Sequence, residues 1–190
     1  MFARAPGQRP PIETRRLVLR LPELGDVPAL VEYHSANREH LQPWWPTWPP
    51  DIFEAGFWQA QVRQRRTEFV NGRACAMFVF ERQGGALVGS LSLNQIVRGA
   101  SHTCSIGYGL AESAQGHGYM VEAVRAAVDF AFRDLHLHRI TACYIPHNRR
   151  SGNVLRSAGF AVEGYARDYL CIDGRWEDHV MTGLVNPEWA

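Results

Sequence analysis

Paired cysteines are missing from this sequence. Its four cysteines, Cys75, Cys104, Cys143 and Cys171, lie far apart, and no two of them form the CxxC pair that is typical of a zinc site. Each lies in a short strand-like run, so we expect four buried free thiols, as in a protein of the reducing cytoplasm. The eight histidines are scattered and do not have the spacing of metal ligands. We therefore expect no metal site.

Long apolar runs and an excess of charge of one sign are missing as well. The longest apolar run, 74-ACAMFVF-80, is far shorter than the roughly 20 residues of a membrane-spanning helix. The segment MFARAPGQRPP lacks the apolar centre of a signal peptide, and we expect residues 1–12 to form a flexible leader. The formal net charge of +1 does not favour direct binding to nucleic acid. We expect a cytoplasmic protein without membrane contact.

The rest of the chain has the pattern of one α+β domain over residues 13–190, with a mixed, mostly antiparallel sheet of about seven strands and about four helices. Strands are predicted over 14–21, 75–81, 86–96, 103–110 and 139–145, and a hairpin over 161–184. Helices are predicted over 27–41, 51–71, 121–135 and 151–158, with Asp26 and Asp51 as caps of the first two. The pair Asp173-Gly174 predicts a type I′ turn in the hairpin.

Two glycines precede the third helix directly, in 115-QGHGYM-120. Glycine is unfavourable in a fixed conformation, so its use here indicates a tight turn, a bare backbone that approaches a ligand, or both. A helix N-terminus exposes unpaired N–H groups and a partial positive charge, and glycines let phosphate oxygens reach them. The segment is neither a P-loop nor a GxGxxG dinucleotide loop. A phosphate or pyrophosphate is therefore the predicted ligand, with an ordinary tight turn as the alternative.

A second motif lies downstream, in 148-NRRSGNVLRSAGF-160. By itself it predicts only a short helix, with Ser151 near its start and Gly159 at its end. Together with QGHGYM, however, it resembles the GNAT acetyltransferase superfamily. QGHGYM is similar to that family's Q/R-x-x-G-x-G/A loop, which holds the pyrophosphate of acetyl-CoA. Asn148 and Ser151 match its N-x-x-S…GF segment, which lines the pantetheine arm. The resemblance implies the GNAT fold and acetyl-CoA as co-substrate, without a metal.

The residues that the resemblance assigns to acetyl-CoA are Tyr108, Leu110, Gln115, Gly116, His117, Gly118, Tyr119, Met120, Asn148, Ser151 and Asn153. Within the family, residues 146–180, 37–44 and 97–110 are similar to the RimJ branch, which acetylates the N-terminal alanine of a ribosomal protein. The likeness extends from Thr14 to Trp189. It implies an N-terminal acetyltransferase with a ribosomal protein as partner, either monomeric or a homodimer.

Three positions depart from the family pattern. Met120 stands where Gly or Ala is preferred, but its backbone N–H is still available to an anion. Leu155 stands where many members have a tyrosine acid, and Ser151 resembles the serine proposed to protonate the leaving thiolate in the related RimL branch. Ser105 stands where many members have a glutamate base. We name Glu68 as a candidate for a water-relayed base, with a solvated helix carboxylate as the alternative.

The absence of a strong base bears on the acceptor. A free α-amine has a pKa of about 7.7–8, whereas that of lysine is about 10.4, so a weak base or a water chain serves an α-amine better. The sequence therefore favours an N-terminal amine over a lysine side chain.

The acceptor site is expected around 42-QPWWPTWPP-50, whose prolines argue against regular structure. Trp44 and Trp45 either wall a substrate groove or pack rigidly between two helices. In the family, the first helices and the last hairpin flank the acceptor. The hairpin residues that the resemblance adds are Tyr165, Tyr169, Asp178 and His179. Two other functions remain open: an acetyltransferase for a small amine (a polyamine, amino acid or antibiotic), and a non-catalytic CoA-binding module in ribosome assembly or regulation.

Overall fold

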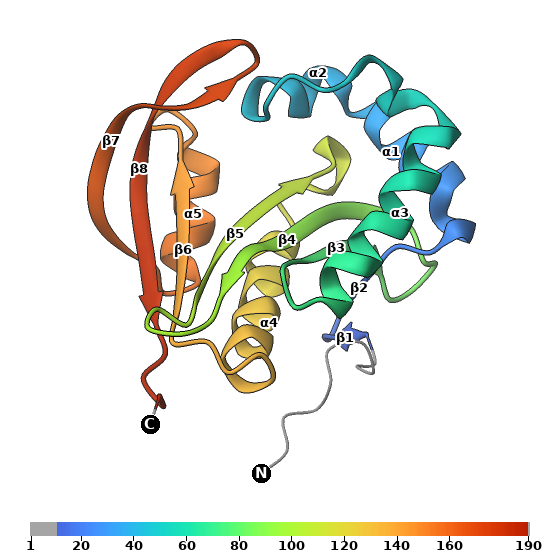
Figure 1. The fold of residues 1–190 in the computed structure, drawn as a ribbon. Coiled ribbons are helices and arrows are strands. Elements are labelled where there is room, and N and C mark those ends of the chain that lie inside the picture. Colours follow the sequence, from blue (N-terminus) through green and yellow to red (C-terminus); the bar gives the residue numbers. More distant parts are fainter. Residues whose placement is uncertain (1–10, 190) are drawn as a thin grey trace.

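A computed structural model describes residues 11–189, and it has one mixed sheet in the order β1-β2-β3-β4-β5-β6-β8-β7 (Figure 1). The strands are β1 (Ile12–Glu13), β2 (Leu17–Arg20), β3 (Cys75–Glu81), β4 (Leu87–Val97), β5 (Thr103–Leu110), β6 (Arg139–Tyr144), β7 (Ala161–Ile172) and β8 (Arg175–Val185). The α-helices are α1 (Val27–Ala36), α2 (Arg38–Leu41), α3 (Ala55–Val70), α4 (Tyr119–Arg133) and α5 (Arg149–Ser157). The 3-10 helices are η1 (Leu24–Asp26), η2 (Gln42–Trp44), η3 (Pro50–Phe53) and η4 (Glu112–Ala114).

This is the predicted α+β architecture, with a sheet that is antiparallel except between β5 and β6. Residues 11–189 form eight strands and five α-helices, because β1 was not foreseen and the first predicted helix is divided in two. Residues 1–10 of the predicted leader lie outside the described residues, and Ile12 already belongs to β1. No helix within residues 11–189 is both long enough and apolar enough to cross a membrane.

The two faces of the sheet are covered by different helices. Along β3, Phe78 and Phe80 point to one face, where they pack with Trp58 of α3 and Leu30 of α1. The intervening Val79 belongs to the larger core on the other face, which α4 covers. The alternation follows from the two-residue period of a strand that is buried on both sides.

Helix α4 follows the predicted apolar stripe. Val124, Val128 and Ala131 are buried against the sheet, as the spacing of 3 and 4 residues indicates. The helix begins at Tyr119, directly after Gly118, and ends at Arg133, so Leu135 lies beyond it.

The predicted helix over 27–41 breaks at Asn37. The Asn37 amide Nδ2 donates to the Tyr33 carbonyl at 2.8 Å, and its Oδ1 accepts from the Glu112 backbone N–H at 2.9 Å. Asparagine competes with the helix by bonding the backbone in this way. The break gives α2 a direction that differs from that of α1 (Figure 1).

The structure changes both predicted helix caps. Asp26 is the N-cap residue of α1, as predicted, but its side chain makes no cap bond to that helix. Its carboxylate accepts from the Arg20 guanidinium at 2.6 and 2.7 Å and from the Glu23 N–H at 2.7 Å. Asp51 lies in η3, and α3 begins at Ala55. The proline-rich segment is also more regular than predicted. It contains η2 and the start of η3, with prolines in their first turns. Proline is tolerated there because an N–H in the first turn of a helix has no acceptor within the helix.

The prediction of four buried thiols is only half right. Cys75 and Cys104 are buried, Cys143 is half-buried, and Cys171 is exposed because β7 is the edge strand of the sheet. The hairpin turn is confirmed: β7 and β8 are joined by Asp173 and Gly174 alone, with φ of 46° and 79°.

Candidate active site

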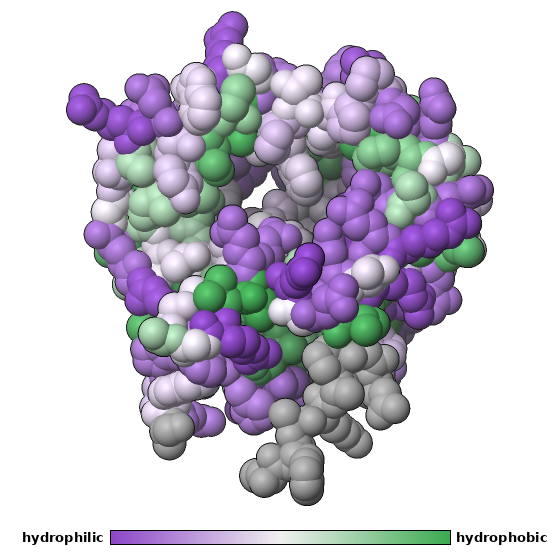
Figure 2. Space-filling model, in the orientation of Figure 1, coloured by the Kyte–Doolittle hydropathy of each residue, from purple (hydrophilic) through white to green (hydrophobic). Residues whose placement is uncertain are grey.

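The cavity lies where two neighbouring strands separate. β5 and β6 pair in parallel only where residues Thr103–Ser105 of β5 lie beside Arg139–Thr141 of β6. Beyond these residues the two strands diverge. The open space between them is part of a cavity of about 1300 Å³. Figure 2 shows the hollow in the middle of this face of the molecule. Such a separation leaves the backbone groups along the facing edges of the two strands accessible to a ligand.

The glycine turn lies on one side of this cavity. Gly116 and Gly118 have φ of 82° and 74°, a conformation that favours glycine, and Gly118 is the N-cap of α4. The turn is held by Arg16, whose Nη1 donates to the His117 carbonyl at 2.8 Å and whose Nε pairs with Glu122 at 2.7 Å. The bare backbone at the N-terminus of a long helix suits a phosphate or pyrophosphate.

Gln115 connects three segments around the cavity. Its Oε1 accepts from Arg150 Nη1 of α5 at 2.6 Å, and its Nε2 lies 2.8 Å from His40 Nε2 of α2. An amide nitrogen donates, so the imidazole Nε2 of His40 is the acceptor in this contact. The side chain of Gln115 therefore ties the glycine turn to both α2 and α5.

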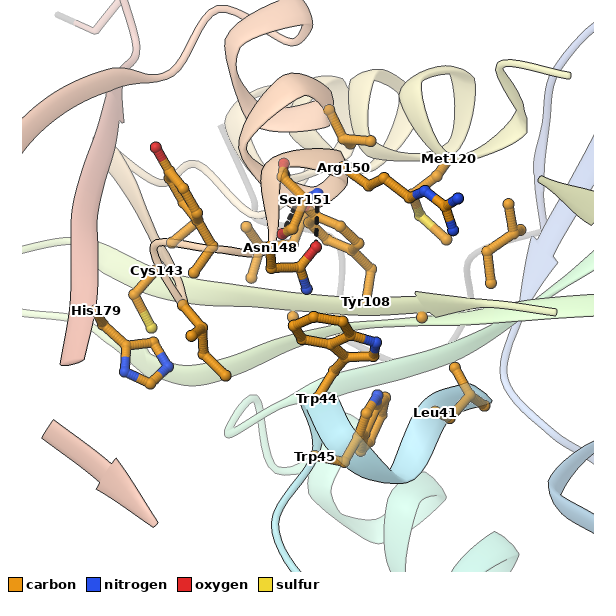
Figure 3. A pocket seen from close by; sticks show the side chains of 18 of the residues that line it. Leu41, Trp44, Trp45, Tyr108, Met120, Cys143, Asn148, Arg150, Ser151 and His179 are labelled. Carbon is orange, nitrogen blue, oxygen red and sulfur yellow. Dashed lines mark hydrogen bonds between the residues drawn. The ribbon is translucent and has the colours of Figure 1, made fainter. Parts of the chain in front are cut away.

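Asn148 and Ser151 form the start of α5. Asn148 Oδ1 accepts from the Ser151 backbone N–H at 3.1 Å, which is a side-chain cap (Figure 3). The hydroxyl oxygens of Ser151 and Tyr108 lie 3.0 Å apart, and Tyr108 Oη also lies 3.0 Å from the Ser151 carbonyl. Burial raises the pKa of Tyr108 to about 12, so its hydroxyl is protonated at neutral pH. Ser151 thus has a protonated phenol directly behind it.

The other side of the cavity is aromatic. Trp44 of η2 lies with its ring centroid 5.5 Å from that of His147, and Trp45 lies against β5 at Gly109. A Cβ at Gly109 would come within 3.2 Å of the Trp45 indole, so the absence of a side chain lets the ring lie there. The hairpin tip reaches the same segment, because the Asp173 N–H donates to the Trp45 carbonyl at 2.9 Å. Residues from η2 and from β7–β8 therefore meet over the cavity.

Most of the residues named from the sequence line this cavity. They are Trp44, Trp45, Tyr108, Leu110, Gln115, Gly116, Gly118, Tyr119, Met120, Asn148, Ser151, Asn153 and Tyr169. The side chain of Tyr119 is turned toward β3, where its hydroxyl donates to Glu81 Oε1 at 2.9 Å. Leu155, at the position of the missing tyrosine acid, is only 1% exposed and belongs to the core.

Four named residues, His117, Tyr165, Asp178 and Glu68, lie elsewhere. His117 is not among the lining residues, and only its carbonyl is engaged, by Arg16. Asp178 faces a separate hollow of about 420 Å³, and its carboxylate accepts from Tyr165 Oη at 2.6 Å. Glu68 lies on α3, where it accepts from Gln64 Nε2 at 2.9 Å, so it has the position of an ordinary helix carboxylate.

The structure adds lining residues that the motifs did not indicate. They include His40, Cys143, His147, Arg150 and Met181, while His179 had been named only as one of several hairpin residues. These side chains come from α2, β6, α5, β8 and the segment between β6 and α5, and no spacing in the sequence joins them. None of the lining residues is an aspartate or a glutamate. Across residues 11–189 there is no group of three His, Cys, Asp or Glu side chains arranged to hold a metal ion.

Comparison with known proteins agrees with this geometry. The model of the acetyltransferase (GNAT) domain matches residues 16–161. The [ribosomal protein uS5]-alanine N-acetyltransferase of Escherichia coli strain K12 is 40% identical over 179 residues, which are 94% of this chain and 92% of the relative.

Two solved structures are similar along most of their length. The ribosomal-protein-S5-alanine acetyltransferase of Vibrio fischeri superposes with a TM-score of 0.91 at 34% identity, covering 96% of this chain and 100% of that one. Mycobacterium smegmatis RimJ in complex with CoA-disulfide gives a TM-score of 0.85 at 31% identity, covering 90% and 83%. The chain therefore belongs to the GNAT acetyltransferase family, within which its relatives are of the RimJ and RimL kind, and it is an N-acetyltransferase.

Proposed function

We propose that this enzyme transfers the acetyl group of acetyl-CoA to the N-terminal α-amine of a protein in the cytoplasm, and that the acceptor is a ribosomal protein that begins with alanine. The observation that carries the proposal is the character of the cavity, which is lined by aromatic side chains and by no carboxylate. A polyamine is a polycation, and a site for it would need buried acidic partners. The name of the E. coli relative, an alanine N-acetyltransferase for uS5, supports the same acceptor.

The residues present fit a coenzyme A thioester. The bare turn of Gly116 and Gly118 at the start of α4 would hold the pyrophosphate. The polar edge of the diverging strands and Asn148 would hold the amides of the pantetheine arm. Gly152 supports this arrangement, because a Cβ there would come within 2.8 Å of the Tyr144 ring, and its absence lets α5 approach β6 closely.

The proposed chemistry is direct attack of the amine on the thioester carbonyl. A C–N bond forms, the C–S bond breaks, and the thiolate of coenzyme A needs a proton as it leaves. Ser151 Oγ is the hydroxyl placed to supply it. The protonated Tyr108 hydroxyl lies 3.0 Å from both the Ser151 carbonyl, to which it donates, and Ser151 Oγ, and it would turn to Oγ to replace the proton. This pair takes the role that the missing tyrosine at Leu155 has in other members of the family.

The acceptor is an α-amine and not a lysine because of the cost of deprotonation. With no carboxylate in the cavity, deprotonation at pH 7 is easier for an α-amine by about 3 kcal/mol, given the ordinary pKa values of the two amines. The aromatic walls formed by Trp44, Trp45 and Tyr169 suit a small first residue followed by extended chain.

The test is a matched set of acceptors assayed by release of coenzyme A thiol. One peptide has a free N-terminal alanine and no lysine, and the second is N-terminally blocked and carries a lysine. Spermidine and free amino acids complete the set. We expect turnover of the first peptide to exceed that of the others at least tenfold. Faster turnover of the blocked lysine peptide or of spermidine would overturn the acceptor, and no thiol release with any amine would favour a CoA-binding module.

A further inference from the structure

The proposed reaction needs a group that takes a proton from the amine nitrogen. Among the lining residues there is no carboxylate, and Ser105, at the position of the family's glutamate, makes only a 3.4 Å contact with the Asn94 carbonyl. The groups that can accept a proton near neutral pH are the three lining histidines, His40, His147 and His179.

Two of these histidines are poorly suited. His40 uses its Nε2 lone pair to accept from the Gln115 amide at the glycine-turn side of the cavity. His147 is exposed, and its ring lies beside Trp44 at the rim, so water competes for both of its nitrogens. Neither presents a free lone pair to the inside of the cavity.

His179 is different on both counts. It is only 4% exposed, and its Nδ1 lies 2.9 Å from the Glu177 carbonyl. A carbonyl oxygen only accepts, so Nδ1 carries the hydrogen of the neutral ring and the lone pair is at Nε2. No hydrogen bond to this Nε2 is found within residues 11–189. The Glu177 carbonyl therefore fixes the tautomer in which Nε2 of His179 can accept a proton.

The strand register directs this ring into the cavity. Met181, two residues further along β8, lies opposite Cys143 of β6, and His179, Met181 and Cys143 all line the cavity. Figure 3 shows His179 at the end of the cavity away from Met120 and Arg150, which flank the glycine turn. It thus lies toward the acceptor side, with the Tyr169 ring packed at 5.7 Å and 67°.

We propose that His179 is the general base of the acetyl transfer, an inference that rests on the proposed function. As the nitrogen lone pair forms the C–N bond, the amine loses one proton to His179 Nε2, directly or through one water. The C–S bond breaks, and the thiolate takes the hydroxyl proton of Ser151. The serine regains a proton through Tyr108 and solvent, and the imidazolium returns its proton to solvent, so the step balances.

The titratable groups that face His179 come from the two neighbouring strands: Tyr169 of β7 packs on the ring, and Cys143 of β6 shares its cavity wall. Asp178 precedes His179 on β8 and points the other way, into the separate hollow. The Asp178 carboxylate accepts from Tyr165 Oη and the Asp168 N–H, and these bonds, with the charge of Arg167, hold the pKa of Asp178 below its ordinary value. The Asp178 carboxylate is therefore ionised throughout the neutral range.

The test is the pH dependence of kcat at saturating acetyl-CoA and peptide. In the wild-type enzyme kcat should fall on the acid side, where the imidazole is protonated. His179→Gln should lower kcat about 100-fold at pH 7 and remove this acid limb, because an amide cannot accept the proton. The Kd for coenzyme A should stay within about twofold of wild type, since the ring lies away from the glycine turn.

Three further variants make the result decisive. His179→Ala should regain part of its kcat when imidazole is added, which a purely structural role would not produce. Ser151→Ala should have a low kcat but keep the acid limb. His138→Gln changes a half-buried histidine outside the cavity and should behave as wild type.

A His179→Gln enzyme with near wild-type kcat, or with its acid limb intact, overturns this proposal. If that variant does not fold, imidazole rescue of His179→Ala decides. A wild-type enzyme without activity on peptide N-termini overturns the proposed function instead.

Discussion

The two ends of the cavity are built on different principles. The end assigned to coenzyme A consists of two short contiguous segments, 115–120 and 148–153, and it works through backbone geometry: positive φ at glycines, a helix N-terminus and an asparagine cap. The acceptor end consists of side chains from distant segments, with Trp44 from η2 and Tyr169 and His179 from the last hairpin. A single backbone bond from Asp173 to Trp45 connects these segments.

The difference indicates how each end can change. A backbone anion site depends on conformation, so few substitutions are compatible with it. A wall of side chains can be replaced residue by residue while the fold stays the same. We therefore expect substitutions at the first end to weaken the binding of coenzyme A, and those at the second end to change acceptor binding or proton transfer while coenzyme A binding is kept.

The largest expected effect comes from Gly118→Pro. Proline fixes φ near −65°, whereas Gly118 has φ of 74°, and proline has no N–H to offer a phosphate. We expect the Kd for coenzyme A to rise about 100-fold or more, since hydrogen bonds to charged groups contribute about 1.5–3 kcal/mol each. Isothermal titration calorimetry measures this directly.

Gly84→Pro is the matched control for that variant. Gly84 has φ of 85° in the turn between β3 and β4, outside the cavity, so the same strain is introduced away from the ligand. It should lower stability without changing the Kd. An equal loss of affinity in both variants would mean that strain, and not the anion site, explains the effect.

The fold was largely predictable because its signals are local. Hydrophobic periodicity predicts the apolar stripe of α4 and the strands β3 to β6, and one residue pair, Asp173-Gly174, predicts the hairpin turn. The errors lie where tertiary contacts decide. Asn37 ends α1 because its amide oxygen also accepts from the Glu112 N–H of η4, which is 75 residues away in the sequence. The Asp26 carboxylate forms an ion pair with Arg20 and makes no side-chain cap bond to α1.

The site divides in the same way. The predicted turn and the Asn148–Ser151 cap bring most of their residues to the cavity because a motif specifies its own geometry. The partnership of Tyr108 with Ser151 could not be predicted, since it depends on how β5 lies beside α5. Nor could the tautomer of His179, which depends on one carbonyl. Glu68 was named by residue type alone, and its helix holds it away from the cavity.

An intermediate effect is expected from Trp44→Ala at the acceptor end. Removal of the indole takes away a wall of the cavity beside His147 but leaves the glycine turn unchanged. We expect the KM for the alanine peptide to rise about tenfold, or about 1.4 kcal/mol, and the KM for acetyl-CoA to change less than about twofold. Trp176→Ala, on a side chain that is 66% exposed outside the cavity, is the control. Equal changes in both KM values would show that the two ends are not separable.

The smallest effect is expected where the glycine turn is braced. The Glu122 carboxylate on α4 accepts from Thr14 Oγ1 at 2.6 Å and from the Arg16 N–H and Nε at 2.9 and 2.7 Å, and Arg16 in turn holds the turn at His117. Glu122→Gln places an amide against these donors. We expect stability to fall by about 1 kcal/mol, which lowers Tm by about 2–4 °C, and the Kd for coenzyme A to rise by about threefold or less.

The pH dependence of that loss separates it from a packing effect. Burial tends to raise the pKa of Glu122, but the hydrogen bonds and charges of Thr14 and Arg16 outweigh it and hold the pKa below the ordinary value. A lowered pKa in the folded state adds stability above the ordinary pKa and loses it as the pH falls through that range, so the wild-type advantage should be full at pH 7 and fade below about pH 4. Glu68→Gln makes the same change on α3 and should leave Tm and kcat within error. If the Tm difference for Glu122→Gln persists at pH 3, Glu122 stabilises the turn through packing and not through its charge. If Glu68→Gln lowers kcat, Glu68 takes part in the reaction.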